Sequence, residues 1–190
     1  MRALLLAALL LPSAAAAKGL GTVVSTTGKL TAKGKTLRAG DAIPAGAVDL
    51  ESGTATLAID GGRLLLTGPA RVAMHAAEVR LDAGSLLLAL KKKFRRYMVR
   101  TPVAVAAVRG TEFFVEVVDS STVDVCICHG ALDVTGNGME KTAMVSADHE
   151  GMRFTKDKDG KVSGSLAKAG GHTETQLESL RAALNGSPKP

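Results

Sequence analysis

The sequence predicts an all-β protein, arranged as a solenoid-like or sandwich-like stack of short strands with one helix at the C-terminal end. From residue 20 to about residue 134, apolar residues alternate with polar ones at a period of two, which is the period of a half-buried strand. Turn-forming pairs that contain Gly recur about every eight to twelve residues. Long helical patterns, which parallel βαβ units need between their strands, are missing from this part of the sequence.

The first 17 residues have the pattern of a secretory signal peptide. Arg2 provides a positive start, residues 4–11 are apolar, and Ala15-Ala16-Ala17 forms a small-residue cleavage site before Lys18. The apolar run is too short for a membrane-spanning helix, which needs about 20 residues, and later apolar runs are broken by Gly or charge. We therefore expect a protein that does not span a membrane and is periplasmic or secreted after cleavage of the signal peptide.

Composition narrows the classes of partner. The chain has 24 Lys+Arg against 18 Asp+Glu, a net charge of +6. In an exported protein, this charge favours an envelope protein or an anionic envelope polymer as the partner. Nucleic acid is not expected, because the chain has no Trp, one Tyr and four Phe, and so lacks the aromatic side chains on which single strands stack. The oligomeric state does not follow from the sequence.

One strongly basic segment is a candidate binding surface. Its charged residues surround Phe94 and are Lys91, Lys92, Lys93, Arg95 and Arg96. Such a segment is suited to phosphate-rich polymers or an acidic protein face. The alternative is a solvated loop or strand edge, where like charges discourage pairing with other strands.

The domain organisation expected from these patterns is simple. A β domain covers residues 18–136, a strand and hairpin extension covers 137–172, an amphipathic helix covers 173–185, and a short tail covers 186–190. In the extension, residues 142–145 and 152–155 are expected strands. Thr173 and Gln176 form a capping box at the helix start. Leu177, Leu180 and Leu184 form a stripe that we expect to pack on the sheet.

Within residues 99–134, the sequence shows three alternating runs, at 103–108, 113–117 and 123–127. Arg109-Gly110-Thr111 is expected to separate the first two runs, and Gly130 is expected to form a turn after the third.

Catalytic motifs are missing. The sequence has no G-x-S-x-G and no phosphate-binding G-x-x-x-x-G-K-[ST], and His149-Glu150 lacks the second His of H-E-x-x-H. We therefore expect a protein that is not an enzyme.

The residues with the most distinctive chemistry are two cysteines and nearby histidines. The period of two places Cys126 and Cys128 on the same face of a strand, with Val125 and Ile127 on the other face. Residues i and i+2 of a strand have Cα atoms roughly 6.5–7 Å apart, at the upper limit for a disulfide. Two thiolates on one face can instead bind a soft metal ion, zinc or copper(I).

Histidines can complete such a site. His149 is the expected third ligand if the segment 142–155 pairs back beside the strand that carries the cysteines, and His129 is a further candidate. His75 and His172 are expected to be isolated and solvated. Three interpretations of the cysteines remain open: shielded structural thiols, a metal or redox site, and a disulfide with local distortion.

Residues 99–134 also carry a family resemblance. The run VRTPVAVAAVRGTEFFVEV followed by STVDVCICHGALDV closely resembles the FecR domain, with its T-P before a β run, its G-T-x-F-x-V strand and the Gly that ends the next strand. The matching positions are Thr101, Pro102, Gly110, Thr111, Phe113 and Gly130. Earlier elements match in order, so the resemblance covers residues 20–136.

This resemblance implies an all-β periplasmic domain without catalytic residues. In iron-uptake regulators of this family, the domain receives a signal from the signalling domain of an outer-membrane, TonB-dependent receptor. It passes that signal through a transmembrane helix to a cytoplasmic anti-sigma segment. The present chain begins instead with a cleavable signal, and Cys-Ile-Cys-His replaces the usual V-x-V-x-E-G ending. We therefore expect a free-standing module for protein interaction, envelope binding or accessory signalling, with a periplasmic metal-binding or redox protein as the alternative.

Overall fold

A computed structural model describes residues 19–91, 97–168 and 170–185. The expected signal peptide (residues 1–17), the basic residues Lys92, Lys93, Arg95 and Arg96, and the tail at 186–190 lie outside these ranges. The strands are β1 (Gly21–Thr26), β2 (Leu30–Ala32), β3 (Lys35–Leu37), β4 (Gly46–Leu50), β5 (Thr54–Ile59), β6 (Gly62–His75), β7 (Glu78–Leu90), β8 (Tyr97–Arg100), β9 (Ala104–Val117), β10 (Thr122–Gly136), β11 (Thr142–Ser146), β12 (Glu150–Lys156) and β13 (Val162–Leu166). The helix α1 (Glu174–Asn185) follows them.

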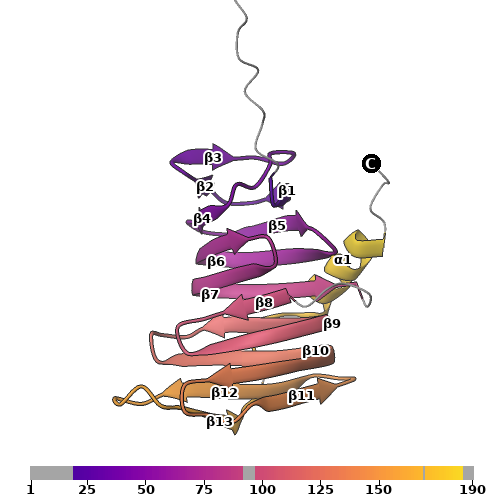
Figure 1. The fold of residues 1–190 in the computed structure, drawn as a ribbon. Helices are drawn as coiled ribbons and strands as arrows, with labels where there is room; N and C mark the ends of the chain where they lie inside the picture. The colour runs from indigo at the N-terminus through magenta and orange to yellow at the C-terminus, as the bar shows by residue number, and fades with distance from the viewer. Residues whose placement is uncertain (1–18, 92–96, 169, 186–190) are drawn as a thin grey trace, which may run out of the picture.

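The described strands form one 13-stranded sheet that rises as a stack, with β1 to β3 at one end and β11 to β13 at the other (Figure 1). Neighbouring strands pair antiparallel, except for β7 and β8, which are parallel. The predicted all-β class and the single C-terminal helix are both confirmed.

The four long strands bend, and each contributes to two faces of the stack. β10 pairs with β12 through residues 122–127 and with β11 through residues 130–134. β6 behaves in the same way, pairing first with β5 and then with β4. The bends make a single sheet enclose its own core, so the stack combines features of a solenoid and of a sandwich.

These bends correct the turns expected at two positions. Residues 109–111 do not separate two strands, because β9 runs through them, and β10 continues through Gly130 to Gly136. The register between β9 and β10 shifts on either side of His129. This shift is a β-bulge, and the chain does not reverse its direction there. Gly130 has φ of +111°, and a Cβ there would lie 3.1 Å from Thr111 Cα, so glycine allows the strand to bend against its neighbour.

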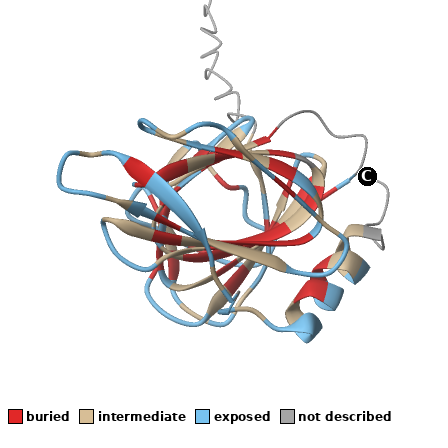
Figure 2. Cartoon of the chain, turned by 90° about the horizontal axis from the view of Figure 1, so that it is seen from below, coloured by how far each residue is buried: buried red, intermediate tan, exposed pale blue. Residues whose placement is uncertain are grey.

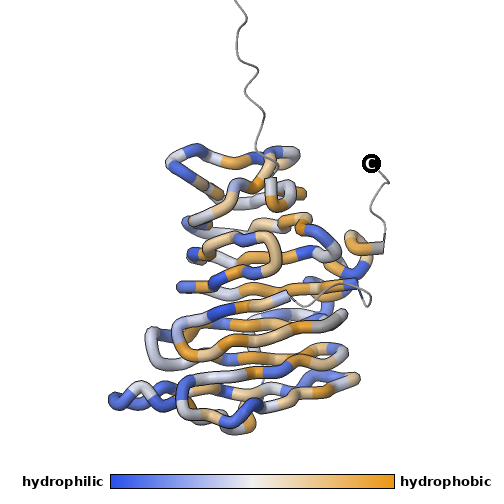
Figure 3. Tube along the Cα trace, in the orientation of Figure 1, coloured by the Kyte–Doolittle hydropathy of each residue, from blue (hydrophilic) through white to orange (hydrophobic). Residues whose placement is uncertain are grey.

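Buried side chains form two clusters on opposite sides of the sheet. The larger cluster fills the interior and includes the inward residues of the long strands, such as Leu64, Leu88, Phe113 and Ile127. Figure 2 shows buried residues along the strands that form the ring. Hydrophilic residues gather at turns such as the one between β12 and β13 in Figure 3. The second cluster lies on the outer face, beneath the helix, and consists of Leu87, Ala89, Phe114, Cys126, Cys128, Leu177 and Leu180.

The helix α1 starts and packs as its sequence predicts. The Gln176 amide donates to Thr173 Oγ1 at 3.2 Å, and the Thr173 amide donates to Gln176 Oε1 at 2.9 Å, which completes the capping box. Leu177 and Leu180 are buried against the outer face of the sheet, and Leu184 is partly buried there. The helix lies outside the ring of strands in Figure 2. Across the described ranges, no helix combines the length and apolarity needed to cross a membrane.

Candidate metal centre

The two cysteines lie side by side on the outer face of β10. Val125 and Ile127 point into the interior, whereas Cys126 and Cys128 belong to the outer cluster and are 1% and 2% exposed. The predicted alternation is therefore present. Neither thiol forms a disulfide, so two sulfur atoms that could bind a metal project from the same face of the strand, two residues apart.

His149 reaches the cysteines from the turn between β11 and β12. β12 pairs with β10, so that Gly151 lies opposite Cys126 and Glu150 opposite Ile127. His149 is the next residue along, and its Nδ1 atom lies 3.4 Å from Cys126 Sγ. The expected pairing of this segment beside the cysteine strand is thus present, and it brings His149 to the site.

The backbone at His149 is unusual. Its φ is +41°, in the left-handed region that non-glycine residues seldom adopt, although His does so more often than most. Residues held in this region are concentrated at binding and active sites, where surrounding contacts offset the strain.

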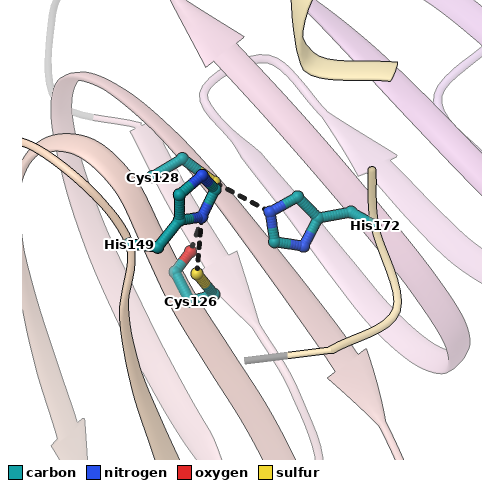
Figure 4. Close-up of side chains that lie close together, drawn as sticks. All are labelled: Cys126, Cys128, His149 and His172. Carbon is teal, nitrogen blue, oxygen red and sulfur yellow. Dashed lines mark hydrogen bonds between the residues drawn. The ribbon is translucent and has the colours of Figure 1, made fainter. Parts of the chain in front are cut away.

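A fourth residue, His172, was expected to be solvated, and this expectation is wrong. Its Nε2 atom lies 3.4 Å from Cys128 Sγ (Figure 4). Its ring stacks on Phe114 with centroids 4.9 Å apart and planes at 25°. Gly171 makes this position possible, because it has φ of +86° and passes so close to Phe114 that a Cβ would lie 2.5 Å from its Cζ atom. The capped helix start and the preceding Gly-Gly pair were the only signs in the sequence that the chain turns here.

The four side chains offer a compact set of ligand atoms. Both cysteine sulfurs and one nitrogen from each of His149 and His172 lie within 4.8 Å of one another. A tetrahedral zinc ion, with Zn–S distances of about 2.3 Å and Zn–N distances of about 2.0–2.1 Å, has ligand atoms roughly 3.3–3.8 Å apart. The two S···N distances of 3.4 Å already fall in this range, so small side-chain movements would close the set around an ion.

Glu174 supports His149 from the opposite side of its ring. His149 Nε2 lies 2.5 Å from Glu174 Oε1. When Nε2–H donates to this carboxylate, the neutral ring presents its Nδ1 lone pair toward Cys126. Metal-binding histidines in proteins commonly have such a carboxylate partner, which fixes the tautomer and the ring orientation.

The local electrostatics favour one thiolate in the set. Hydrogen bonding from Cys128, aided by His149, lowers the pKa of Cys126 to about 7. Hydrogen bonding to Cys126 and burial raise the pKa of Cys128, which keeps its proton. The Cys126 and Glu174 contacts raise the pKa of His149, whereas burial lowers the pKa of His172. Because metals bind thiolates and neutral imidazoles, the site needs one further deprotonation at Cys128 when an ion binds.

One ring nitrogen of His172, the Nδ1 atom, is buried without a hydrogen-bond partner among the described residues. The Nε2 atom of His172 faces the cysteines, and its ring stacks on Phe114.

Other predicted site residues lie elsewhere. His129 is exposed at the bulge of β10 and lines a cleft with Glu112 and Arg181, outside the set of four. Lys91 is exposed at the end of β7, and the other four residues of the basic segment fall outside the described ranges. The structure therefore brings together three of the residues considered as ligands and adds His172.

The motif residues have structural roles. Thr101 Oγ1 donates to the Ala104 carbonyl at 2.8 Å and so closes the connection, through Pro102, between β8 and β9. Phe113 is fully buried in the interior. Thr111 Oγ1 donates to the Ala131 carbonyl at 2.7 Å and joins β9 to β10 beside Gly110 and Gly130. Thr111 and Gly130 thus lie at the bend of the paired strands β9 and β10.

Comparison with known protein families finds a match for part of the chain. Residues 52–133 match the FecR protein family. The match includes Cys126 and Cys128 but ends before His149 and His172, so half of the ligand set lies beyond it. None of the curated proteins is significantly similar in sequence to the chain.

Two crystal structures of a candidate anti-sigma factor from Parabacteroides distasonis ATCC 8503 are similar to the chain. Each has 16% sequence identity and a TM-score of 0.46. The first, at 1.65 Å resolution, aligns over 58% of this chain and 53% of that one. The second, at 2.50 Å, aligns over 67% and 57%. The chain thus spans little more than half the length of these proteins.

Proposed function

We propose that this chain, which carries a FecR-family domain at residues 52–133, binds one soft metal ion through Cys126, Cys128, His149 and His172. The observation that carries the proposal is the convergence of these four ligand atoms within 4.8 Å. A tetrahedral set of two sulfurs and two nitrogens favours zinc. Copper(I), which shares the preference for thiolates, is the second ion to consider.

The form of the site supports binding for structure or sensing over catalysis. Catalytic zinc sites keep a coordination position open for water, whereas structural sites fill all four positions with protein ligands. Here, four protein ligands are available, and both sulfurs are buried. The proposed role is therefore non-enzymatic, in keeping with the regulatory character of the FecR family.

Native mass spectrometry of protein purified without chelator tests this proposal. We expect a mass that includes one zinc ion, and we expect the Cys126→Ser/Cys128→Ser variant to have lost it. A His75→Gln/His129→Gln variant is the matched control, because both histidines are exposed and lie outside the ligand set. The proposal fails if the protein is metal-free with two free thiols and then binds added zinc or copper(I) no better than the serine variant does.

A second function, favoured by the family match, is that of a protein-interaction or accessory signalling module of the cell envelope. We propose the periplasm as its location, on the basis of the signal-peptide pattern in residues 1–17. N-terminal sequencing of the protein from an envelope fraction should begin at Lys18 if the proposed cleavage occurs. The protein partner would belong to the envelope, and the anionic envelope polymer would be a competing ligand.

Salt dependence separates these two ligands. A specific protein partner should bind the immobilised chain saturably at low and high salt, whereas polymer bound through exposed Lys and Arg should be lost at high salt. The interaction role is contradicted if no saturable partner from the envelope is retained at either salt concentration.

A further inference from the structure

We infer that the metal ion fastens helix α1 to the outer face of the sheet, so that metal occupancy controls whether the helix stays docked. This inference rests on the metal binding proposed above and assigns a consequence to it. The observation behind it is the origin of the four ligands. Cys126 and Cys128 come from β10, His149 from the turn before β12, and His172 from the segment directly before α1.

An ion bound to this set would connect the start of α1 to the sheet. His172 lies two residues before Glu174, the first residue of the helix, and Glu174 itself contacts His149. The sulfur atoms belong to the centre of a long, well-paired strand. A metal bond to His172 would thus join the segment that leads into α1 to a central strand of the sheet.

The remaining contacts of α1 are few. Leu177 and Leu180 are its two buried residues, and they pack on an outer strip formed by Leu87, Ala89 and Phe114 together with the cysteines. Arg181 forms an ion pair with Glu112 of β9 at 2.6 Å. The Arg181 side chain is 40% exposed and that of Glu112 is 17% exposed, so the pair is partly buried and contributes only modestly to stability.

Helix α1 also has limited stability of its own. It has 12 residues, and isolated helices shorter than about 12–15 residues are marginal in water. Its capping contacts are internal and do not hold it to the sheet. Loss of the metal would leave three leucines, the Arg181–Glu112 pair and the Glu174–His149 contact to retain it. Its departure would uncover the strip of Leu87, Ala89 and Phe114.

Hydrogen exchange of the full chain, with zinc and after chelation, tests this inference. We expect chelation to increase amide exchange in residues 174–185 at least tenfold, while exchange in the core of β6 stays unchanged. Zinc occupancy is measured in the same samples by native mass spectrometry. A chain that takes up no zinc contradicts the proposed metal binding itself, whereas a chain that binds zinc without slowing exchange in α1 contradicts only the fastening.

Two single-ligand variants sharpen the test. His172→Ala leaves Cys126, Cys128 and His149 to hold zinc but removes the ligand next to α1, so exchange in α1 should stay fast at saturating zinc. His149→Ala removes a ligand from a different segment and keeps His172, so zinc should still slow exchange in α1. Equal behaviour of the two variants at confirmed zinc occupancy overturns the inference.

Discussion

His149 Nε2 lies 2.5 Å from Glu174 Oε1, so the first residue of α1 contacts a candidate metal ligand that comes from the turn between β11 and β12. The contact fixes which ring nitrogen of His149 carries the proton and leaves Nδ1 facing Cys126 Sγ at 3.4 Å. A helix that begins with a carboxylate is common, because acidic residues complement the positive end of the helix dipole. In this chain, the same carboxylate also orients an imidazole.

The Glu174→Gln substitution should weaken zinc binding without removing a ligand. The amide keeps the size of the side chain but loses the charge that holds the Nε2–H tautomer of His149. Loss of such a supporting carboxylate typically lowers metal affinity about 10–100-fold. Competition with a chromophoric chelator measures the change. Glu178→Gln is the matched control on the same exposed side of α1 and should leave the affinity unchanged.

The metal-free protein should contain a thiolate that titrates near neutral pH. Contacts with Cys128 and His149 stabilise the charged form of Cys126, so its pKa falls from the usual 9.0 to about 7. The ultraviolet absorbance of the thiolate, followed from pH 5 to 10 under reducing conditions, should therefore show a step near pH 7. Cys126→Ser should remove this step, and His149→Gln should move it to higher pH. A single transition near pH 9 in the unmodified chain would contradict the stated pKa.

The Gly171→Ala substitution should disturb the site from a position that holds no ligand. An alanine Cβ there would lie 2.5 Å from Phe114 Cζ, and φ of +86° is unfavourable for alanine. The backbone would have to move, and His172 would move with it, so zinc affinity should fall at least tenfold. Gly170→Ala is the matched control, because a Cβ at Gly170 meets no atom within 4 Å. If both variants bind zinc like the unmodified chain, the position of His172 does not depend on this close approach.

Much of the site follows from the period of strands. Alternation alone places Cys126 and Cys128 on one face, and the pairing of β12 with β10 brings His149 beside them. His172 could not be predicted in this way. It lies in the irregular segment between β13 and α1, 44 residues after Cys128, and no repeating pattern sets its position. Its place depends on a glycine conformation and on stacking with Phe114, which are tertiary contacts.

Some features of the fold could also be predicted from the sequence, whereas others could not. The all-β class and the capped helix follow from apolar spacing and from the Thr173 and Gln176 pair. The lengths of the strands do not, because a glycine with positive φ is compatible with both a turn and a bulge. At Gly130, long-range pairing determines that the chain forms a bulge and not a turn, because β10 pairs with β9 on both sides of this position.

The Thr111→Val substitution should separate the stability of the bend from metal binding. Thr111 is 1% exposed, and its hydroxyl donates to the Ala131 carbonyl at 2.7 Å across the bulge in β10. Valine has nearly the same shape but removes this part-buried hydrogen bond, which should lower the free energy of unfolding by about 0.5–1.5 kcal/mol. Urea denaturation of the metal-free protein measures the loss, with the exposed Thr22→Val of β1 as the control. Zinc stoichiometry should stay at one ion per chain, because the bend residues do not touch the ligand set. A stable variant that has lost its zinc would show that the bend acts on the site directly.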